Sequence, residues 1–284
     1  MSLVKIMKIY CYLLFLVVLC SGLIACSGDN SELPLQLDTE ENSAVINVDE
    51  MVLIPAGEVT LGTNEKTGLT FGNEADQHVV FVEAFYIDKY EVTNEQYAKF
   101  LSETGHRKPK FWDNPTLNAP DQPVVGVNWE DAETYAEWVG KRLPTDIEWE
   151  KAARSTDKRL YPWGANYNAS LGNFDDGGQM NGKLDGYAME TAPVGSFAEG
   201  VSPYGLHDMA GNVWEWVIST IDDDAIDAYT AKINSELTNG IIYTIRGGSW
   251  TNGPADTRTT VFYIYPAQCS DHSSSVGFRC AKTP

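Results

Sequence analysis

The chain has 284 residues with 40 acidic and 20 basic side chains, which gives a formal net charge of −20. This balance argues against a nucleic-acid partner, because phosphate backbones are bound by Lys and Arg. The length suits one large domain or two small ones and is sufficient to bury most of the apolar surface. Acidic side chains spread along a chain indicate solubility, and the alternative is that some of them bind divalent cations.

Residues 1–25 have the pattern of a bacterial export signal. Lys5 and Lys8 precede an apolar run that is short for a membrane-spanning helix, which is the alternative. The run ends in Leu-Ile-Ala-Cys, which resembles the lipobox of bacterial lipoproteins and implies cleavage before Cys26 and acylation of its thiol. Ser27 is not the Asp typical of inner-membrane retention. We therefore expect an exported protein of the cell envelope, anchored through Cys26 in the outer membrane of a Gram-negative bacterium.

Residues 26–50 are expected to form the acylated cysteine and a flexible tether. The segment after Cys26 is polar and acidic with few aromatic side chains. The folded domain is therefore predicted over residues 51–284. Once the signal is removed and Cys26 is acylated, Cys269 and Cys280 remain, and either a disulfide between them or a free, buried Cys280 is compatible with export.

Three segments carry the start signals of helices. Thr93 and Thr145 each begin a capping box, with Gln96 and Glu148 three residues later, and Asn128 is an N-cap residue. The helices predicted from these signals run from Thr93 to Gly105, from Trp129 to about Val139, and from Thr145 to Arg154.

The remaining structure is predicted to be short strands and long loops. Apolar runs at 51–55, 79–88 and 241–246 predict strands, and 278–280 predicts a last one. Residues 161–203 are rich in Gly, Asn and Asp and have no clear period. A loop of that length is unusual unless something holds it, and metal ions are the candidate.

Eight motifs follow one another along residues 51–284. They are MVLIPAGEVTLGT (51–63), FYIDKYEVTNEQYAKFL (85–101), PVVGVNWEDAETYAEWVGKRLPTDIEWEKAAR (123–154), YPWG (161–164), PVGSF (193–197), YGLHDMAGNVWEW (204–216), RGGSW (246–250) and GFRC (277–280). In this order they resemble the formylglycine-generating enzyme, or sulfatase-modifying factor, family. The resemblance implies an α+β domain with the family's C-type-lectin-like fold, small antiparallel sheets, about three helices and long calcium-braced loops.

The resemblance implies two calcium sites. Their side chains are oxygen donors, as calcium requires, and the alternative is capped turns with solvated acids. The first site is implied at Asn173, Asp185 and the backbone carbonyls of Phe174 and Tyr187, and the second at Asp208, Glu215 and the carbonyls of Gly211 and Val213.

The resemblance also implies where copper binds in the family's oxidases. There the serine of the Arg-Gly-Gly-Ser turn is followed by two cysteines whose thiolates hold Cu(I), a soft ion that prefers sulfur. Ser249 matches the serine, but the cysteine positions fall on Asn252 and Thr257. We therefore expect no copper site, and Cys269 and Cys280 do not replace it. Arg246 and Arg279 are expected to be structural arginines that pair with buried carboxylates or carbonyls.

A binding role is the interpretation favoured by these residues. Aromatic faces with amide and charged neighbours suit the recognition of a peptide or a sugar, and the alternative is that Trp250 and the tyrosines belong to the core. The expected groove consists of Trp250, Asn252, Asp256, Arg258, Tyr263 and Tyr265.

Three functions follow from the sequence. The first is an envelope lipoprotein with a non-catalytic binding or structural domain, whose partner is an envelope protein, a peptide or a glycan. The second is a formylglycine-generating oxidase acting on a sulfatase cysteine, or a related metal-dependent oxidase. The third is a calcium-dependent glycan-binding lectin.

Overall fold

The computed structural model describes residues 47, 49–65, 73–175, 185–220, 242–266 and 273–284. The chain divides into two units, Met1–Val45 and Ile46–Pro284, and the described residues all belong to the second. The predicted signal, Cys26, most of the predicted tether and Cys269 lie outside them. No helix within the described ranges is long and apolar enough to cross a membrane.

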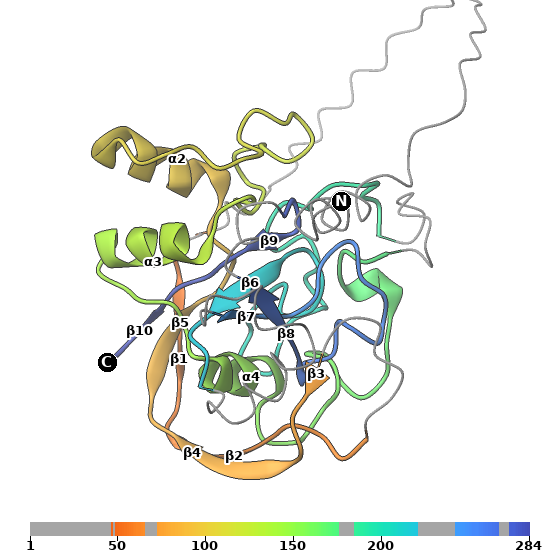
Figure 1. Cartoon of the computed structure of the whole chain (residues 1–284). Helices are drawn as coiled ribbons and strands as arrows, with labels where there is room; N and C mark the ends of the chain where they lie inside the picture. Colours follow the sequence, from red (N-terminus) through yellow and green to blue (C-terminus); the bar gives the residue numbers. More distant parts are fainter. Residues whose placement is uncertain (1–46, 48, 66–72, 176–184, 221–241, 267–272) are drawn as a thin grey trace, which may run out of the picture. The chain divides into compact units, whose positions relative to one another are not determined.

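Within the described residues, short strands form three small sheets (Figure 1). The first has the order β1-β5-β10, with β1 (Met51–Ile54), β5 (Phe85–Asp88) and β10 (Ala281–Lys282). The second is a ribbon of β2 (Gly57–Leu61) and β4 (His78–Val82). The third has the order β3-β8-β7-β6-β9, with β3 (Asn73–Glu74), β8 (Val261–Pro266), β7 (Ile242–Arg246), β6 (Trp214–Val217) and β9 (Val276–Gly277). Pairing is antiparallel except between β6 and β9.

The three predicted helices are confirmed. They are α2 (Asn94–Thr104), α3 (Trp129–Trp138) and α4 (Asp146–Arg154), and each begins with a capping box. Gly105 ends α2 in the left-handed conformation, with φ of 70°. The stretch 161–203 holds one short 3-10 helix, η1 (Ala169–Leu171), in its described part.

Two strand predictions need correction. The run 79–88 is not one strand, because β4 and β5 are separated at Glu83–Ala84 and pair with different strands. Residues 278–280 are not a strand either, since they connect β9 to β10. Their carbonyls instead accept bonds from the segment that leaves β5, as Cys280 O does from Asp88 N at 2.8 Å.

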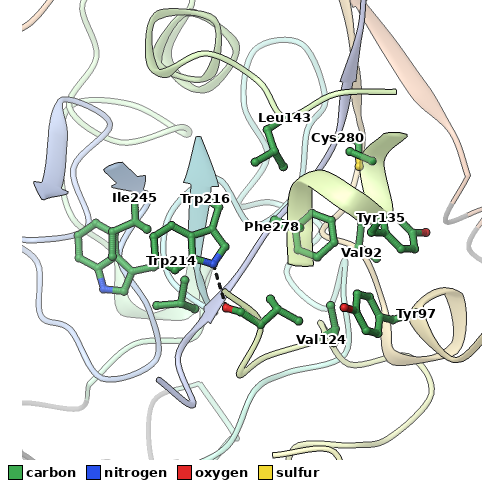
Figure 2. Packing of buried hydrophobic residues seen from close by; sticks show 14 of the residues in the cluster. Val92, Tyr97, Val124, Tyr135, Leu143, Trp214, Trp216, Ile245, Phe278 and Cys280 are labelled. Atoms are coloured by element: carbon green, nitrogen blue, oxygen red, sulfur yellow. Dashed lines mark hydrogen bonds between the residues drawn. The ribbon is translucent and has the colours of Figure 1, made fainter. Parts of the chain in front are cut away.

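The core has two parts, one on each side of the β6–β7 region. In the first, α2 and α3 pack on the five-stranded sheet. Figure 2 shows Tyr97 and Tyr135 beside Phe278, with Trp216 of β6 next to them, and the Tyr97 and Tyr135 rings stack at 5.6 Å. The second combines apolar residues of α4, β1, β2, β4 and β5, and it contains the fully buried Trp149. The candidate site lies in the loops that follow β5 and β7 and in the loop that precedes β6.

Candidate functional site

The turn that follows β7 is built from an arginine and two glycines. Arg246 is buried, with Nη1 3.3 Å from Glu150 Oε2, and it donates to the carbonyl of Thr260 at 3.1 Å. Gly248 has φ of +74°, and a Cβ there would lie 2.6 Å from Cγ2 of Thr257 and 3.0 Å from its Cα. Only glycine avoids both the strain and the clash, which explains why the turn has this sequence.

The side-chain oxygen of Asn252 accepts the hydrogen bonds that close this turn. Its Oδ1 accepts from Ser249 Oγ at 2.7 Å, from Trp214 Nε1 at 2.9 Å and from Ser249 N at 3.2 Å. Thr257 is fully buried, and its hydroxyl donates to the carbonyl of Gly253 at 3.3 Å. Both residues at the oxidase cysteine positions therefore have structural contacts inside the turn.

The predicted binding groove is wrong for four of its six residues because they are buried. Trp250, Asn252, Asp256 and Arg258 are 8%, 7%, 3% and 4% exposed. Arg258 Nη2 lies 2.8 Å from Glu74 Oε2, inside the protein. The alternative of a core role holds for Trp250, and the surface that suggested a lectin is not formed by these four side chains.

The two tyrosines of that prediction lie on β8. Tyr263 is partly buried and packs against Trp214, with ring centres 6.5 Å apart. Tyr265 pairs with Tyr243 of β7 through the backbone, and its side chain lies outside the described part.

A buried ion pair lies behind the turn. The two carboxylate oxygens of Glu215 on β6 accept hydrogen bonds from Arg279 Nε and Nη2, both at 2.7 Å. One of them also accepts from Trp149 Nε1 at 2.8 Å. Arg279 and Glu215 are both 0% exposed, and the structural role predicted for Arg246 and Arg279 is confirmed. Arg279 already neutralises the charge of Glu215, so the excess negative charge that a calcium ion would offset in the predicted second site lies elsewhere.

Asp208 instead adjoins a second buried carboxylate, Glu91, which lies after β5. Asp208 Oδ2 accepts from Gly195 N at 2.7 Å, and Glu91 Oε1 accepts from Asn212 Nδ2 at 3.0 Å. Glu91 Oε2 is buried without a hydrogen-bond partner in the described structure. Burial raises the pKa of Asp208 to about 6, and burial and then repulsion by Asp208 raise the pKa of Glu91 well above its usual value. Since Arg279 bonds Glu215 and backbone carbonyls, this pair retains excess negative charge unless a proton or a cation neutralises it.

The raised pKa values predict that an amide pair is more stable than the wild type near pH 7 when no divalent cation is present. Glu91→Gln with Asp208→Asn keeps both acceptors and removes the repulsion. The folded wild type binds protons between about pH 4 and pH 6 that the unfolded chain does not bind, so the wild type gains stability as the pH falls through this window. The advantage of the double variant should therefore shrink toward pH 5.

Urea unfolding of both proteins in chelator, at each pH, measures this difference. Burial lowers the pKa of His207 to about 4, which acts in the opposite direction, but it does so in both proteins and cancels when they are compared. A difference in stability that does not change with pH would contradict the electrostatic interpretation.

The residues of the first implied calcium site lie together. Asp185 Oδ2 accepts from Phe174 N at 3.0 Å, and its Oδ1 accepts from Tyr187 N at 2.9 Å. Asn173 is 1% exposed, and its Oδ1 is buried without a partner in the described structure. Such an orphaned amide oxygen fits a cation with oxygen ligands.

The two implied sites adjoin through the backbone of the 208–216 turn. A Cβ on Gly211 would lie 2.5 Å from the carbonyl oxygen of Asn173, and Val213 is fully buried. No group of three or more His, Cys, Asp or Glu side chains in the described ranges is arranged to hold a metal ion. Each site would therefore depend on backbone carbonyls as well as side chains.

Cys280 is a free thiol, fully buried beside the Asp88–Lys141 ion pair, whose atoms are 2.6 Å apart. Its predicted partner, Cys269, lies outside the described residues, and within them Cys280 is free and buried, as the alternative has it. Burial raises the pKa of this thiol well above its usual value, so it stays protonated and unreactive.

Glu91 and Asn212 were not predicted as site residues, although both lie in motifs that carry the family resemblance. Asn212 is 0% exposed and joins Glu91 to Asn173 through its side-chain amide. The available signal was a polar residue inside an otherwise apolar motif.

Comparison with known proteins agrees with the family resemblance of the motifs. The profile of the FGE-sulfatase family, described as a sulfatase-modifying factor enzyme 1-like domain, matches residues 36–284. The formylglycine-generating enzyme of Thermomonospora curvata is 31% identical over 293 residues, which covers 82% of this chain and 93% of the relative. Hercynine oxygenase of Mycolicibacterium smegmatis is 32% identical over 73% of this chain and 55% of its own length. The serine/threonine-protein kinase pkn1 of Chlamydia caviae is 33% identical over 82% of this chain, which spans 38% of that relative.

Solved structures confirm the fold. PvdO from Pseudomonas aeruginosa has a TM-score of 0.63 at 28% identity and covers 82% of this chain and 94% of its own. CarF has a TM-score of 0.56 at 20% identity, covers 83% of this chain and 98% of its own, and supports the fold alone. The predicted α+β domain with three helices, small antiparallel sheets and a C-type-lectin-like fold is therefore confirmed.

Proposed function

We propose that this chain, which belongs to the family of sulfatase-modifying factor enzyme 1-like domains, is a non-catalytic binding or structural module of the cell envelope. The observation that carries the proposal is the contact set of Asn252. At the position where the resemblance implies a copper thiolate, this chain has an amide oxygen that accepts four hydrogen bonds, three from its own turn and one from Trp214. Because Asn252 is engaged in these internal hydrogen bonds and Thr257 is buried, the two positions favour a structural role over an oxidase role.

An oxidase is the second candidate, and the relatives support it. Two of them, at 31% and 32% identity, are named formylglycine-generating enzyme and hercynine oxygenase. An enzyme built on this chain would need reactive groups other than Asn252 and Thr257.

The test offers the full-length chain, purified in detergent, both Cu(I) and a peptide of the form Cys-x-Pro-x-Arg. The formylglycine-generating enzyme of Thermomonospora curvata serves as the positive control. We expect no copper after desalting and no aldehyde in the peptide mass. Stoichiometric copper or conversion of the peptide would overturn the non-catalytic proposal and favour the oxidase.

We also propose that two calcium ions brace the long loops. Asn173 Oδ1 and Asp185 would hold the first ion. Asp208 and Glu91 would hold the second ion, while Glu215 would remain in its ion pair with Arg279. A bound calcium ion supplies positive charge, so at the second position it would offset the repulsion between the two buried carboxylates.

Calcium is therefore expected to stabilise the wild type, by about 2.7 kcal/mol at a free concentration one hundred times the dissociation constant. Glu91→Gln with Asp208→Asn should bind one equivalent fewer by calorimetry, whereas Glu83→Gln, an exposed carboxylate of similar size, should bind as the wild type does. Equal stoichiometry in all three proteins would rule out the site at Asp208 and Glu91.

The envelope location is proposed from the lipobox at 23–26. A multiply acylated Cys26 would anchor the domain stably, since each buried CH₂ contributes about 0.8 kcal/mol. Mass spectrometry of the N-terminal peptide of the membrane-bound protein tests this, and we expect a peptide that begins at an acylated Cys26. A peptide that still carries residues 1–25 would argue for the alternative of a transmembrane helix.

A further inference from the structure

We propose that β4 pairs with the β4 strand of a second copy of this chain, so that two β2–β4 ribbons form one four-stranded sheet. The ribbon lies at the end of the domain remote from α2 and α3 (Figure 1). In the described structure, β2 is the one strand that neighbours β4, so its other edge presents backbone groups to no strand. An unpaired edge is a template for another strand.

The side chains of this ribbon are apolar on the outside as well as the inside. Val82 is buried and Val80 partly buried toward the α4 side, as the alternation of a strand requires. Val79 and Phe81 point the other way and are 63% and 59% exposed, the largest values among the exposed large apolar side chains described. Proteins usually block an edge with Lys, Pro or a bulge, and His78–Val82 contains neither Lys nor Pro.

The sequence of β4 is complementary to itself, which favours a second copy over an unrelated partner. In antiparallel pairing centred on Val80, Val79 of each copy lies opposite Phe81 of the other. Aromatic and β-branched side chains opposite one another are a favourable cross-strand pair, and this one occurs twice. Gln77 of each copy then lies opposite Glu83 of the other, where an amide donates to a carboxylate. A register shifted by two residues places Val79 opposite Glu83, or Phe81 opposite Gln77, and loses these pairs.

Charge also favours this surface. A net charge of −20 opposes the close approach of two copies over most of the domain. Between His78 and Val82 there is no Asp or Glu, and Glu58 lies on β2, one strand farther from the two-fold axis. The β4 edge is therefore a stretch where two acidic domains meet with no carboxylate opposite another, since Glu83 of each copy lies opposite Gln77.

Sedimentation equilibrium of the full-length chain in density-matched detergent tests the pairing. We expect a concentration-dependent dimer, and we expect Phe81→Glu and Val79→Lys each to raise the dissociation constant by about tenfold or more, because a charge replaces an apolar contact. Both positions are exposed, so each variant should keep the wild-type unfolding midpoint. Leu53→Lys on β1, at a side chain 49% exposed, is the matched control and should dimerise as the wild type does.

Mixing the Val79→Lys and Phe81→Glu variants identifies the register. In a mixed dimer centred on Val80, the introduced lysine of one copy faces the introduced glutamate of the other, while the second Val–Phe pair is intact. The mixture should therefore dimerise more tightly than either variant alone. A wild type that stays monomeric at every concentration overturns the proposal. So does a mixture no tighter than the separate variants, which would show that these side chains meet a different surface.

Discussion

Replacing Arg279 by methionine is expected to lower the free energy of unfolding by about 3–5 kcal/mol. The guanidinium makes two 2.7 Å bonds to Glu215 and one bond each to the carbonyls of Asp88, Lys89 and His207. Methionine fills part of the space but leaves the Glu215 carboxylate charged, buried and bonded only to Trp149 among these partners. The cost of an uncompensated buried charge exceeds any gain from the apolar side chain.

Chemical unfolding monitored by tryptophan fluorescence measures this loss. Arg279→Met combined with Glu215→Gln should recover part of it, because the neutral amide needs no counter-charge. Lys108→Met, which removes an exposed ion pair with Asp113 at 3.8 Å, should leave stability unchanged. An Arg279 variant as stable as the Lys108 variant would show that the ion pair does not hold the loops together.

Asn252→Leu is expected to cost about 2–4 kcal/mol of stability, because it leaves more than one buried donor without an acceptor, at about 1–3 kcal/mol for each. The two side chains have similar volume, so the change mainly removes the acceptor of Trp214 Nε1 and of the Ser249 amide and hydroxyl. Asn166→Leu, at an exposed asparagine, is the matched control.

The same unfolding experiment tests whether the turn needs the side chain of Asn252 for its stability. If Asn252→Leu is much less stable than Asn166→Leu, the asparagine has become part of the structural framework of the turn. Equal stability would mean that the turn closes without this side chain, and the main support for a non-catalytic domain would be lost.

The helices could be predicted from sequence because their signals are local. Thr93, Asn128 and Thr145 each make the capping bonds that their neighbours in sequence allow. The short strands could not be predicted in this way. All four residues of β6, Trp214–Val217, are buried, so no alternation marks it, and β3, β9 and β10 have two residues each and are defined by the strands they meet.

The site was predictable only in part. Resemblance placed Asn173 with Asp185, and the structure brings them together. It also assigned Glu215 to a cation, but Glu215 lies against Arg279, 64 positions along the chain. Which of two carboxylates a guanidinium takes depends on the packing of separate elements, and no local pattern encodes that choice. Glu91 was missed for the same reason.

The strand order of the first sheet has a consequence for how the chain folds. β1, from the start of the domain, and β10, from its end, both pair with β5. The helices can begin to form early, but this sheet cannot close until β10 is available, so we expect slow folding that is dominated by contacts between distant parts of the chain. During that interval apolar strands stay accessible to proteases and chaperones. A chain cut short before β10 cannot finish this sheet, so we expect such a chain to be degraded rather than to accumulate.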